Sequence, residues 1–440
     1  MDRTNVGILG IELYIPKTYV DQTELENFDR VGKGKYTVGL GQKNMSVVGD
    51  REDINSISST VVQNLLEKNS IPPQNIGRLE IGTETLIDKS KSTKTVLMNI
   101  FRGNESIEGV TVINACYGGI QALFNSVAWV ESSAWDGRLA IAVASDIALY
   151  EKGPARATGG AGAVAFLVGP NAPLVLEPLR SVYMTHVYDF FKPVPGSEYP
   201  VVDGHHSIDC YLEAIANCYN SLKGKVGAKN IEELGDYYCL HAPYYKMVRR
   251  AFNKMVLTDI LENPKSYNID LSYAGTPDLK DRKVYNHINN FSQETWQKKC
   301  EPGTLLGKEC GNIYCGALPA ALLSLIYNCS DELLNKRVVM FAYGSGLASS
   351  MFRIHVRPDA GSFIEKTKLN NPLLNLLSSR LKLSPQEYTR RMDKREEDYQ
   401  KNNWTPKDQL EELHEGTFYL VKVDQKWRRY YARKVARPKL

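Results

Sequence analysis

The sequence lacks several features that would define whole classes of protein. Over 440 residues the formal net charge is only +4, without the clustered basic excess of most nucleic-acid-binding proteins. Eight cysteines are too few for a disulfide scaffold in so long a chain, and no second pair lies at ligand spacing from Cys310 and Cys315 to complete a zinc site. We therefore expect reduced thiols, no bound metal and no nucleic-acid partner.

Long unbroken apolar runs are missing too. Two uncharged stretches, 157–176 and 310–330, are long enough to raise the question of a membrane span, but glycine, proline and asparagine interrupt both. We interpret them as buried core, with no membrane partner. The first residues run directly into an apolar strand and leave no room for a leader peptide, which favours a cytoplasmic protein; the terminal Pro438-Lys439-Leu440 only loosely resembles a peroxisomal address.

What the sequence does contain is an alternation of strand and helix patterns. Asp21 and Glu24 have the spacing of a helix capping box. Helical patterns cover 54–68 and 95–101, and a further helix follows Gly119. Strands are predicted at 6–15, 78–85, 110–113, 139–144 and 163–168. Because several strands are apolar throughout, we expect a sheet covered by helices on both faces.

The second half of the chain repeats this order. A glycine-rich turn at 311–316 precedes a helix at 320–326, a strand at 338–342, a glycine loop and a strand at 349–356. Residue identities hardly match, yet the order predicts two similar halves packed back to back. Beyond Pro358 the chain becomes charged, and we expect a helical appendage with one strand at 416–423.

Cys116 is the first candidate for chemistry. A buried strand is expected to turn through Gly118-Gly119 into a helix, which would aim free backbone N–H groups and the positive helix end at the sulfur. This setting lowers a thiol pKa, and the two glycines would let a bulky substrate approach the backbone. The alternative is a small buried hydrophobe, the role of most free cysteines.

His241 is the second candidate, at the end of an apolar strand and before Pro243, a residue suited to a first helical turn. Lys246, Arg249 and Arg250 follow at spacings that place them on one helix face, where they could clamp phosphates. A structural histidine and a solvated basic face would explain the same residues.

Glu84 is the third candidate, in Gly82-Thr83-Glu84-Thr85 at the carboxyl edge of a strand, where ligands gather in α/β proteins. Apolar neighbours would desolvate this carboxylate and raise its pKa, which suits general acid/base work. It could equally brace the strand end. Glycine segments 158–162 and 344–346 match no standard phosphate-binding motif, so they are either phosphate cradles or tight turns.

Longer motifs extend in a fixed order across nearly the whole chain. They lie at 34–42, 50–56, 82–91, 114–119, 343–348, 415–421 and 431–433. In residues and order these motifs resemble those of the eukaryotic 3-hydroxy-3-methylglutaryl-CoA (HMG-CoA) synthase family, within the thiolase-like superfamily. The resemblance is weakest over about 220–305.

The resemblance implies an α/β protein with a thiolase-like fold: two pseudo-symmetric halves in five alternating layers (αβαβα), usually as a homodimer. The halves would span 1–177 and 178–440, with a C-terminal helix and strand appendage from about 358. The implied reaction condenses acetyl-CoA with acetoacetyl-CoA and water to give (3S)-HMG-CoA and free CoA. The pathway would be mevalonate and isoprenoid synthesis; because the CoA thioesters are substrates, no cofactor is implied.

Roles for individual residues follow from the matching motifs. Cys116 would take the acetyl group, Glu84 would remove a proton from the acetyl methyl, and His241 would hold the acetoacetyl-CoA carbonyl. The resemblance also implies contacts to the acetoacetyl or HMG portion from Asn312 and Ser345, to CoA from Thr158, Ser207, Lys246 and Arg250, and support from Asp146 and Asp189. Backbone N–H groups near Cys116 and at 344–345 could stabilise the developing enolate.

The sequence departs from the family pattern at a few positions. Pro154 replaces a usual asparagine, Ala242 a serine, and His205 a lysine, while Arg250 keeps the charge of a lysine but not its shape. We expect these changes to affect CoA affinity rather than chemistry. Two alternatives stay open: another Cys-dependent condensing enzyme, similar to ketoacyl synthase III, and a thiolase-fold protein that binds acyl-CoA without turnover.

Overall fold

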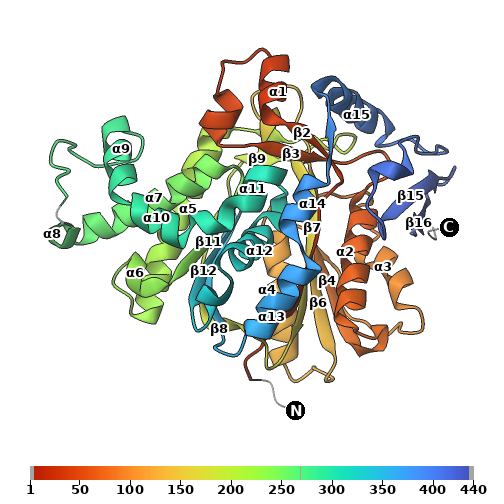
Figure 1. The fold of residues 1–440 in the computed structure, drawn as a ribbon, viewed down its shortest axis with the longest axis horizontal. Helices are drawn as coiled ribbons and strands as arrows, with labels where there is room; N and C mark the ends of the chain where they lie inside the picture. Colours follow the sequence, from red (N-terminus) through yellow and green to blue (C-terminus); the bar gives the residue numbers. More distant parts are fainter. Residues whose placement is uncertain (1–3, 268, 436–440) are drawn as a thin grey trace.

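A nine-stranded mixed sheet forms the centre of the protein, whose computed structural model describes residues 4–267 and 269–435 (Figure 1). In spatial order its strands are β11 (Tyr237–Leu240), β12 (Arg337–Gly344), β13 (Ala348–Val356), β8 (Leu174–Met184), β1 (Gly7–Tyr14), β7 (Gly160–Gly169), β6 (Leu139–Ala148), β4 (Ile76–Gly82) and β5 (Thr111–Val112). The junction in this sheet lies between β8 and β1, where only Gly7↔Val175 and Ile8↔Leu174 pair. The sheet therefore consists of a five-stranded and a four-stranded part.

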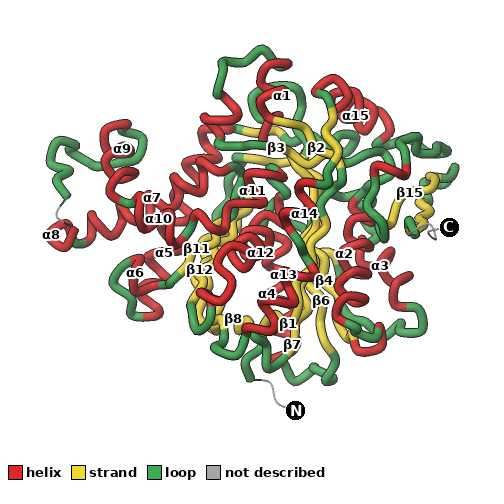
Figure 2. The backbone as a smooth tube through the Cα atoms, in the orientation of Figure 1, coloured by secondary structure: helices red, strands yellow, loops and turns green. Residues whose placement is uncertain are grey.

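Helices cover both parts of the sheet and fill the space between them. The central layer contains α4 (Gly118–Glu131) and α12 (Ala317–Cys329), whose apolar side chains share one core cluster with strands of both parts. Outside lie α2 (Ile54–Asn69) against the first part and α5 (Gly204–Val226) with α7 (Tyr245–Glu262) against the second (Figure 2). The predicted five-layer thiolase-like architecture is confirmed.

Local sequence explains why these elements begin where they do. Asp21 accepts the backbone N–H groups of Thr23 and Glu24 and caps α1 (Gln22–Phe28), as its spacing predicted. Asp53 and Ser56 form a reciprocal capping box at the start of α2. The remaining elements are β2 (Thr18–Asp21), β3 (Asn44–Val47), α3 (Thr93–Leu97), β9 (Phe190–Phe191), β10 (Val201–Val202), α6 (Ile231–Leu234), α8 (Pro264–Tyr267), α9 (Arg282–Phe291), α10 (Gln293–Lys299) and α11 (Leu305–Cys310).

The two long uncharged stretches are core segments, as predicted. Residues 157–176 form β7 and the start of β8, and residues 310–330 form the turn into α12 and that helix. Across the described ranges, no helix has the length and apolar character needed to cross a membrane.

The predicted burial of the strand at 110–113 is wrong. The strand exists as β5, but it ends the sheet, and the side chains of Val110 and Ile113 are 58% and 60% exposed. An apolar pattern alone does not distinguish a central strand from an edge strand whose outer side is uncovered.

The C-terminal appendage contains more strand than the sequence predicted. It comprises α13 (Gly361–Asn370), α14 (Leu373–Ser378), β14 (Leu381–Leu383), α15 (Pro385–Asp398), β15 (Phe418–Val423) and β16 (Arg429–Arg433). The sequence did not indicate β16 because the strand carries charged residues. Two of them, Arg429 and Arg433, form ion pairs with Asp53 and Glu67 of the first half. The appendage thus packs largely on the N-terminal half, where β14 pairs with β2.

Candidate active site

A cavity of about 540 Å³ is lined by residues from both halves of the fold. Six of the residues assigned a catalytic or substrate-binding role line it: Cys116, Thr158, Ser207, His241, Asn312 and Ser345. Aromatic side chains form much of the remaining wall: Tyr150, Phe190, Tyr211, Tyr244, Tyr314 and Tyr343. The cavity therefore combines a nucleophile and a few polar groups with a mainly apolar surface, as small-molecule sites generally do.

Cys116 lies in a sharp turn immediately before α4, with a left-handed φ of +54°. Its backbone N–H donates to Oε2 of Glu84 at 2.7 Å. The end of β12 packs directly against this turn, since a Cβ on Gly344 would lie 1.7 Å from the carbonyl oxygen of Ala115. Glycine at position 344 is thus required to bring the second half against the candidate nucleophile.

The two glycines that follow Cys116 serve protein packing, and the prediction that they admit substrate is wrong. A Cβ on Gly118 would lie 2.8 Å from the carbonyl oxygen of Val112, and one on Gly119 would lie 2.4 Å from the Ala144 Cβ. Both positions face strands of the first half. They allow α4 to approach the sheet closely.

The predicted low pKa of Cys116 is also wrong. Burial raises the pKa of this thiol well above its usual value, and the nearby carboxylates of Glu84 and Asp146 raise it further, while Lys192 opposes them. Burial, reinforced by these two carboxylates, acts in the opposite direction to the helix end that the sequence suggested. The thiol is therefore protonated at neutral pH and must lose its proton as it reacts.

Glu84 connects the nucleophile turn to a buried lysine. Its Oε1 lies 3.0 Å from Lys192 Nζ, and its side chain is only 6% exposed. Burial raises the pKa of Glu84, with Lys192 acting against it, so the predicted desolvated carboxylate is confirmed. Burial lowers the pKa of Lys192, but Glu84 and Asp146 outweigh it and raise that pKa overall, which keeps the cation charged.

Asp146 fixes the position of Glu84 from behind. Its Oδ1 accepts the Thr83 hydroxyl at 2.7 Å and the backbone N–H groups of Glu84 and Thr85, and its Oδ2 accepts the N–H of Cys315. One carboxylate therefore joins the Glu84 strand end to the turn before α12. These contacts agree with the role that the family resemblance implied for Asp146, which is to hold the site from behind.

His241 follows β11 and is buried, with 2% of its surface exposed. Its backbone N–H donates to Phe341 O, and its carbonyl accepts the Tyr211 hydroxyl at 2.6 Å. Burial lowers its pKa to about 3, so the imidazole is neutral at physiological pH. Pro243 lies outside the first helical turn predicted for it, because α7 begins at Tyr245.

The proposed substrate-binding residues divide into two groups. Asn312 is buried and its Oδ1 accepts the N–H of Tyr314, while Ser345 lies beside a loop that Asp189 holds through Gly346 N–H. Thr158 and Ser207 line the cavity as well. Lys246 and Arg250 do not line it. They lie on α7 close to two residues that line the cavity, Met247 and the N-cap residue Tyr244.

Arg249 does not join those cations, so the predicted three-residue clamp is wrong. Its guanidinium donates to Asn289 and Gln293 and lies 5.0 Å from the Trp296 ring centroid. Helical spacing put all three cations on one face, but the neighbouring helices α9 and α10 bury the middle one. Arg249 holds those helices together.

The glycine segment 158–162 packs against protein rather than forming a phosphate cradle. Gly160 and Gly162 belong to β7, and a Cβ on Gly160 would lie 2.5 Å from Cys310 O. Within residues 4–267 and 269–435, no cluster of His, Cys, Asp and Glu could hold a metal ion, and Cys310 and Cys315 are both buried free thiols.

Lys192 is the main residue that sequence reasoning missed. It lies just after the two-residue strand β9, and no motif marks it. Its ammonium also lies 5.0 Å from the Tyr314 ring centroid, so it contacts the turn before α12 directly and is linked to the turn before α4 through Glu84. A lone lysine next to a proline resembles a surface residue in a sequence, and only the tertiary structure pairs it with Glu84.

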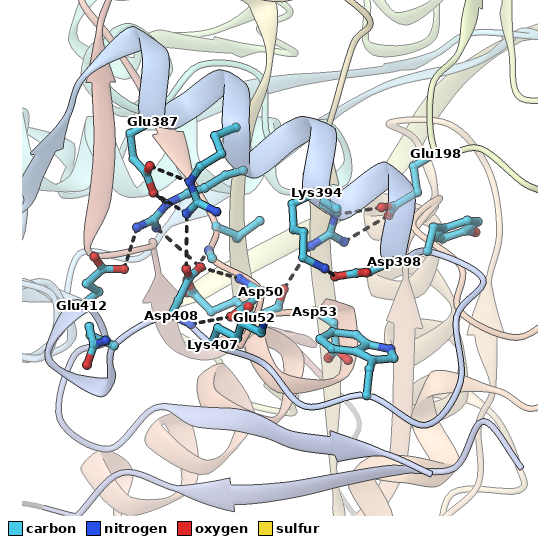
Figure 3. A pocket seen from close by; sticks show the side chains of 18 of the residues that line it. Asp50, Glu52, Asp53, Glu198, Glu387, Lys394, Asp398, Lys407, Asp408 and Glu412 are labelled. Carbon is cyan, nitrogen blue, oxygen red and sulfur yellow. Dashed lines mark hydrogen bonds and ion pairs between the residues drawn. The ribbon is translucent and has the colours of Figure 1, made fainter. Parts of the chain in front are cut away.

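A different cavity, of about 330 Å³, lies between α15 and the segment around residues 48–53 (Figure 3). Ion pairs line it, including Arg395 with Glu198 and, within α15, Lys394 with Asp398. None of Glu84, Cys116 or His241 lines it. A further ion pair there, Arg429 with Asp53, joins the appendage to the N-terminal half.

Comparisons with known proteins identify the family. The sequence matches "Hydroxymethylglutaryl-coenzyme A synthase N terminal" over residues 2–173 and the corresponding "C terminal" description over residues 174–434. It is 47% identical to "Hydroxymethylglutaryl-CoA synthase A" of Dictyostelium discoideum, covering 98% of this chain and 91% of that protein. It is 45% identical to "Hydroxymethylglutaryl-CoA synthase, cytoplasmic" of Gallus gallus, covering 98% and 87% respectively.

A solved structure agrees. "MvaS in complex with 3-hydroxy-3-methylglutaryl coenzyme A" superimposes with a TM-score of 0.84 at 28% identity, covering 99% of this chain and all of that one. The two matched halves, the fold and the cavity between the halves are consistent with one another. The chain belongs to the hydroxymethylglutaryl-CoA synthase family.

Proposed function

We propose that this protein condenses acetyl-CoA with acetoacetyl-CoA and water to form (3S)-HMG-CoA and free CoA, through an acetyl group on Cys116. The observation that carries the proposal is that Cys116 and His241 line one cavity and that the backbone N–H of Cys116 donates to Glu84. The chemistry uses two thioesters and the side chains of this chain, with no cofactor.

In the first step the Cys116 sulfur attacks the acetyl thioester. A C–Sγ bond forms, the bond to the CoA sulfur breaks, and the thiol proton leaves through a nearby base to the departing CoA thiolate. The high pKa of Cys116 favours proton removal during attack over a standing thiolate. Glu84, whose Oε2 accepts the Cys116 N–H, is assigned to the second step and not to this one.

In the second step Glu84 takes a proton from the acetyl methyl, and the resulting enolate carbon forms a bond to the ketone carbon of acetoacetyl-CoA. A methyl beside a thioester is a weak acid, so the base must be desolvated and the enolate oxygen stabilised. Burial of Glu84 meets the first need. The neutral imidazole of His241 can donate one N–H to the acceptor carbonyl as its oxygen becomes negative.

In the last step water hydrolyses the thioester that still joins the product to Cys116. The water oxygen forms a bond to the carbonyl carbon, the C–Sγ bond breaks, and the sulfur regains a proton. HMG-CoA then leaves. Asn312 and Ser345 would contact the acetoacetyl or HMG portion, Thr158 and Ser207 the CoA arm, and Lys246 and Arg250 the CoA phosphates.

Cellular setting and assembly form part of the proposal. We place the protein in the cytoplasm and in mevalonate, isoprenoid and sterol synthesis, supported by the relative named as cytoplasmic. Assembly would be a homodimer formed through the uncovered edge strand β5, since Val110 and Ile113 expose apolar surface beside unpaired backbone groups. The peroxisomal resemblance at 438–440 lies outside the described residues.

Release of free CoA from defined substrates tests this function. Acetyl-CoA plus acetoacetyl-CoA should release CoA and yield HMG-CoA, and acetyl-CoA alone should release about one CoA per enzyme. Condensation of other acyl thioesters with equal efficiency would favour a ketoacyl synthase III-like enzyme. Binding without release of CoA would favour a non-catalytic protein.

A further inference from the structure

The carboxylate of Glu84 separates two cavities. On one side its Oε2 accepts the N–H of Cys116, which lines the 540 Å³ substrate cavity. On the other side its Oε1 forms an ion pair with Lys192 Nζ, and both residues line a second cavity of about 420 Å³. We refer to this second space as the Glu84-side cavity.

The two cavities differ in character. The substrate cavity has mostly aromatic and aliphatic walls near Cys116. The Glu84-side cavity is lined mainly by charged and polar groups, among them Asp88, Lys89, Lys192, Ser197, Glu198 and Gln400. A polar, open space with several hydrogen-bonding partners holds water, whereas the first cavity suits acyl chains.

We propose that the Glu84-side cavity delivers the water that hydrolyses the product thioester on Cys116. This inference rests on the proposed function, in which one water is consumed per turnover. During that step the CoA arm of the bound product fills the substrate cavity. Water must therefore reach the thioester from another direction, and the Glu84 carboxylate stands where the second cavity meets the nucleophile turn.

Glu84 is positioned to use this water as well as to admit it. The water oxygen attacks the carbonyl carbon while Glu84 accepts one water proton, and the C–Sγ electron pair passes to the sulfur. The proton then passes from Glu84 to Sγ, and the new carboxylic acid ionises to solvent. Lys192, 19% exposed and 3.0 Å from Glu84, joins this carboxylate to the polar cavity.

The Glu84-side cavity also adjoins the ion-paired cavity of Figure 3. Both are lined by Ile87, Glu198 and Tyr399, and the Tyr399 hydroxyl donates to Leu86 O. Two neighbouring polar spaces therefore lead from the surface near the appendage toward Glu84.

Narrowing the cavity without touching Glu84 tests the proposal. Val194 is 55% exposed and lines the Glu84-side cavity, so Val194→Trp should obstruct it. Rapid-quench single turnovers with labelled acetyl-CoA followed by acetoacetyl-CoA would resolve acetylation, condensation and hydrolysis. We expect hydrolysis to slow at least tenfold, so that HMG-bearing Cys116 peptide accumulates, while the first two steps change less than twofold.

Matched variants make each outcome decisive. Leu374→Trp adds the same ring at an exposed position of α14 and should leave all three rates unchanged, and Gln400→Phe gives a second obstruction if Val194→Trp does not fold. Unchanged hydrolysis in a folded obstructed variant would overturn the proposal, as would a parallel fall of all three steps. Failure of the unaltered protein to form HMG-CoA would instead reject the proposed function.

Discussion

Two turns in this protein have the same backbone plan and different chemistry. Asn114-Ala115-Cys116-Tyr117-Gly118 leads into α4, and Asn312-Ile313-Tyr314-Cys315-Gly316 leads into α12. In each, the residue two after the asparagine has a left-handed φ, +54° at Cys116 and +44° at Tyr314. Non-glycine residues in this conformation cost roughly 1–2 kcal/mol, so the fold itself imposes the turn twice.

The difference between the turns lies in what surrounds the left-handed residue. Cys116 is partly accessible and has Glu84 on its backbone N–H, whereas Tyr314 is fully buried and its ring packs against Lys192. Pseudo-symmetry thus supplied two equivalent turns at the centre of the molecule, and only one acquired a nucleophile and a carboxylate. The other became part of the cavity wall.

Removing the Glu84 carboxylate should have the largest effect on the chemistry that distinguishes the two turns. Glu84→Ala should still form acetyl-enzyme but condense it about 10²–10⁴-fold more slowly, because no positioned base remains for the methyl proton. Single-turnover formation and decay of acetyl-enzyme measure the two steps. A parallel fall of both steps with lower thermal stability would mean that Glu84 only braces the strand end; loss of acetylation alone would assign it to Cys116 ionisation.

Lys192 contacts Tyr314 of one turn and is linked to the other turn through Glu84, so replacing it probes what they share. Lys192→Met removes the charge that opposes the raised pKa of Glu84, so the acid limb of the condensation pH profile should move to higher pH. Lys192→Arg retains the charge and should restore most of the profile. If the limb stays in place while the rate falls, Lys192 acts only through packing.

His241 shows that the candidate catalytic residue of the second half follows a strand, β11, and does not come from the turn before α12. Its folded pKa of about 3 is below the unfolded value, so the unfolded chain binds the extra proton. Stability should fall as pH drops from 6.5 toward 3, by up to about 1.4 kcal/mol per pH unit relative to His241→Gln. Denaturant titrations from pH 7.5 to 5 measure this, with exposed His205→Gln as control; identical slopes in both variants would contradict it.

The smallest effects should come from the helix that follows His241. Lys246→Ala and Arg250→Ala should each raise the KM for CoA thioesters up to about fivefold and weaken its salt dependence, since partly exposed ion pairs contribute about 1 kcal/mol or less. The kcat should change little. Lys254→Ala, two turns further along α7, is the matched control, and equal KM values in all three variants would make this face solvated surface.

Much of the fold could be predicted from the sequence, and Cys116, Glu84 and His241, chosen there as candidates, lie at or beside one cavity. Strand and helix periodicity located the central elements, and the order of glycine-rich turns indicated two halves. The pKa of Cys116 could not be predicted, because it depends on burial of the thiol and on Glu84 and Asp146, which tertiary contacts bring near it. The burial of Arg249 depends likewise on helices α9 and α10, where the family resemblance is weakest.

The division of labour between the two turns is tested most directly by finding where the acetyl group attaches. Incubation with labelled acetyl-CoA alone, followed by acid quench and peptide mapping, should place about one label per chain on the peptide that contains Cys116. Cys116→Ser should carry no thioester label and lose turnover, while Cys315→Ser, altered in the other turn, should still be labelled at Cys116. Label on Cys315 or another cysteine, or normal turnover by Cys116→Ser, would contradict the assignment.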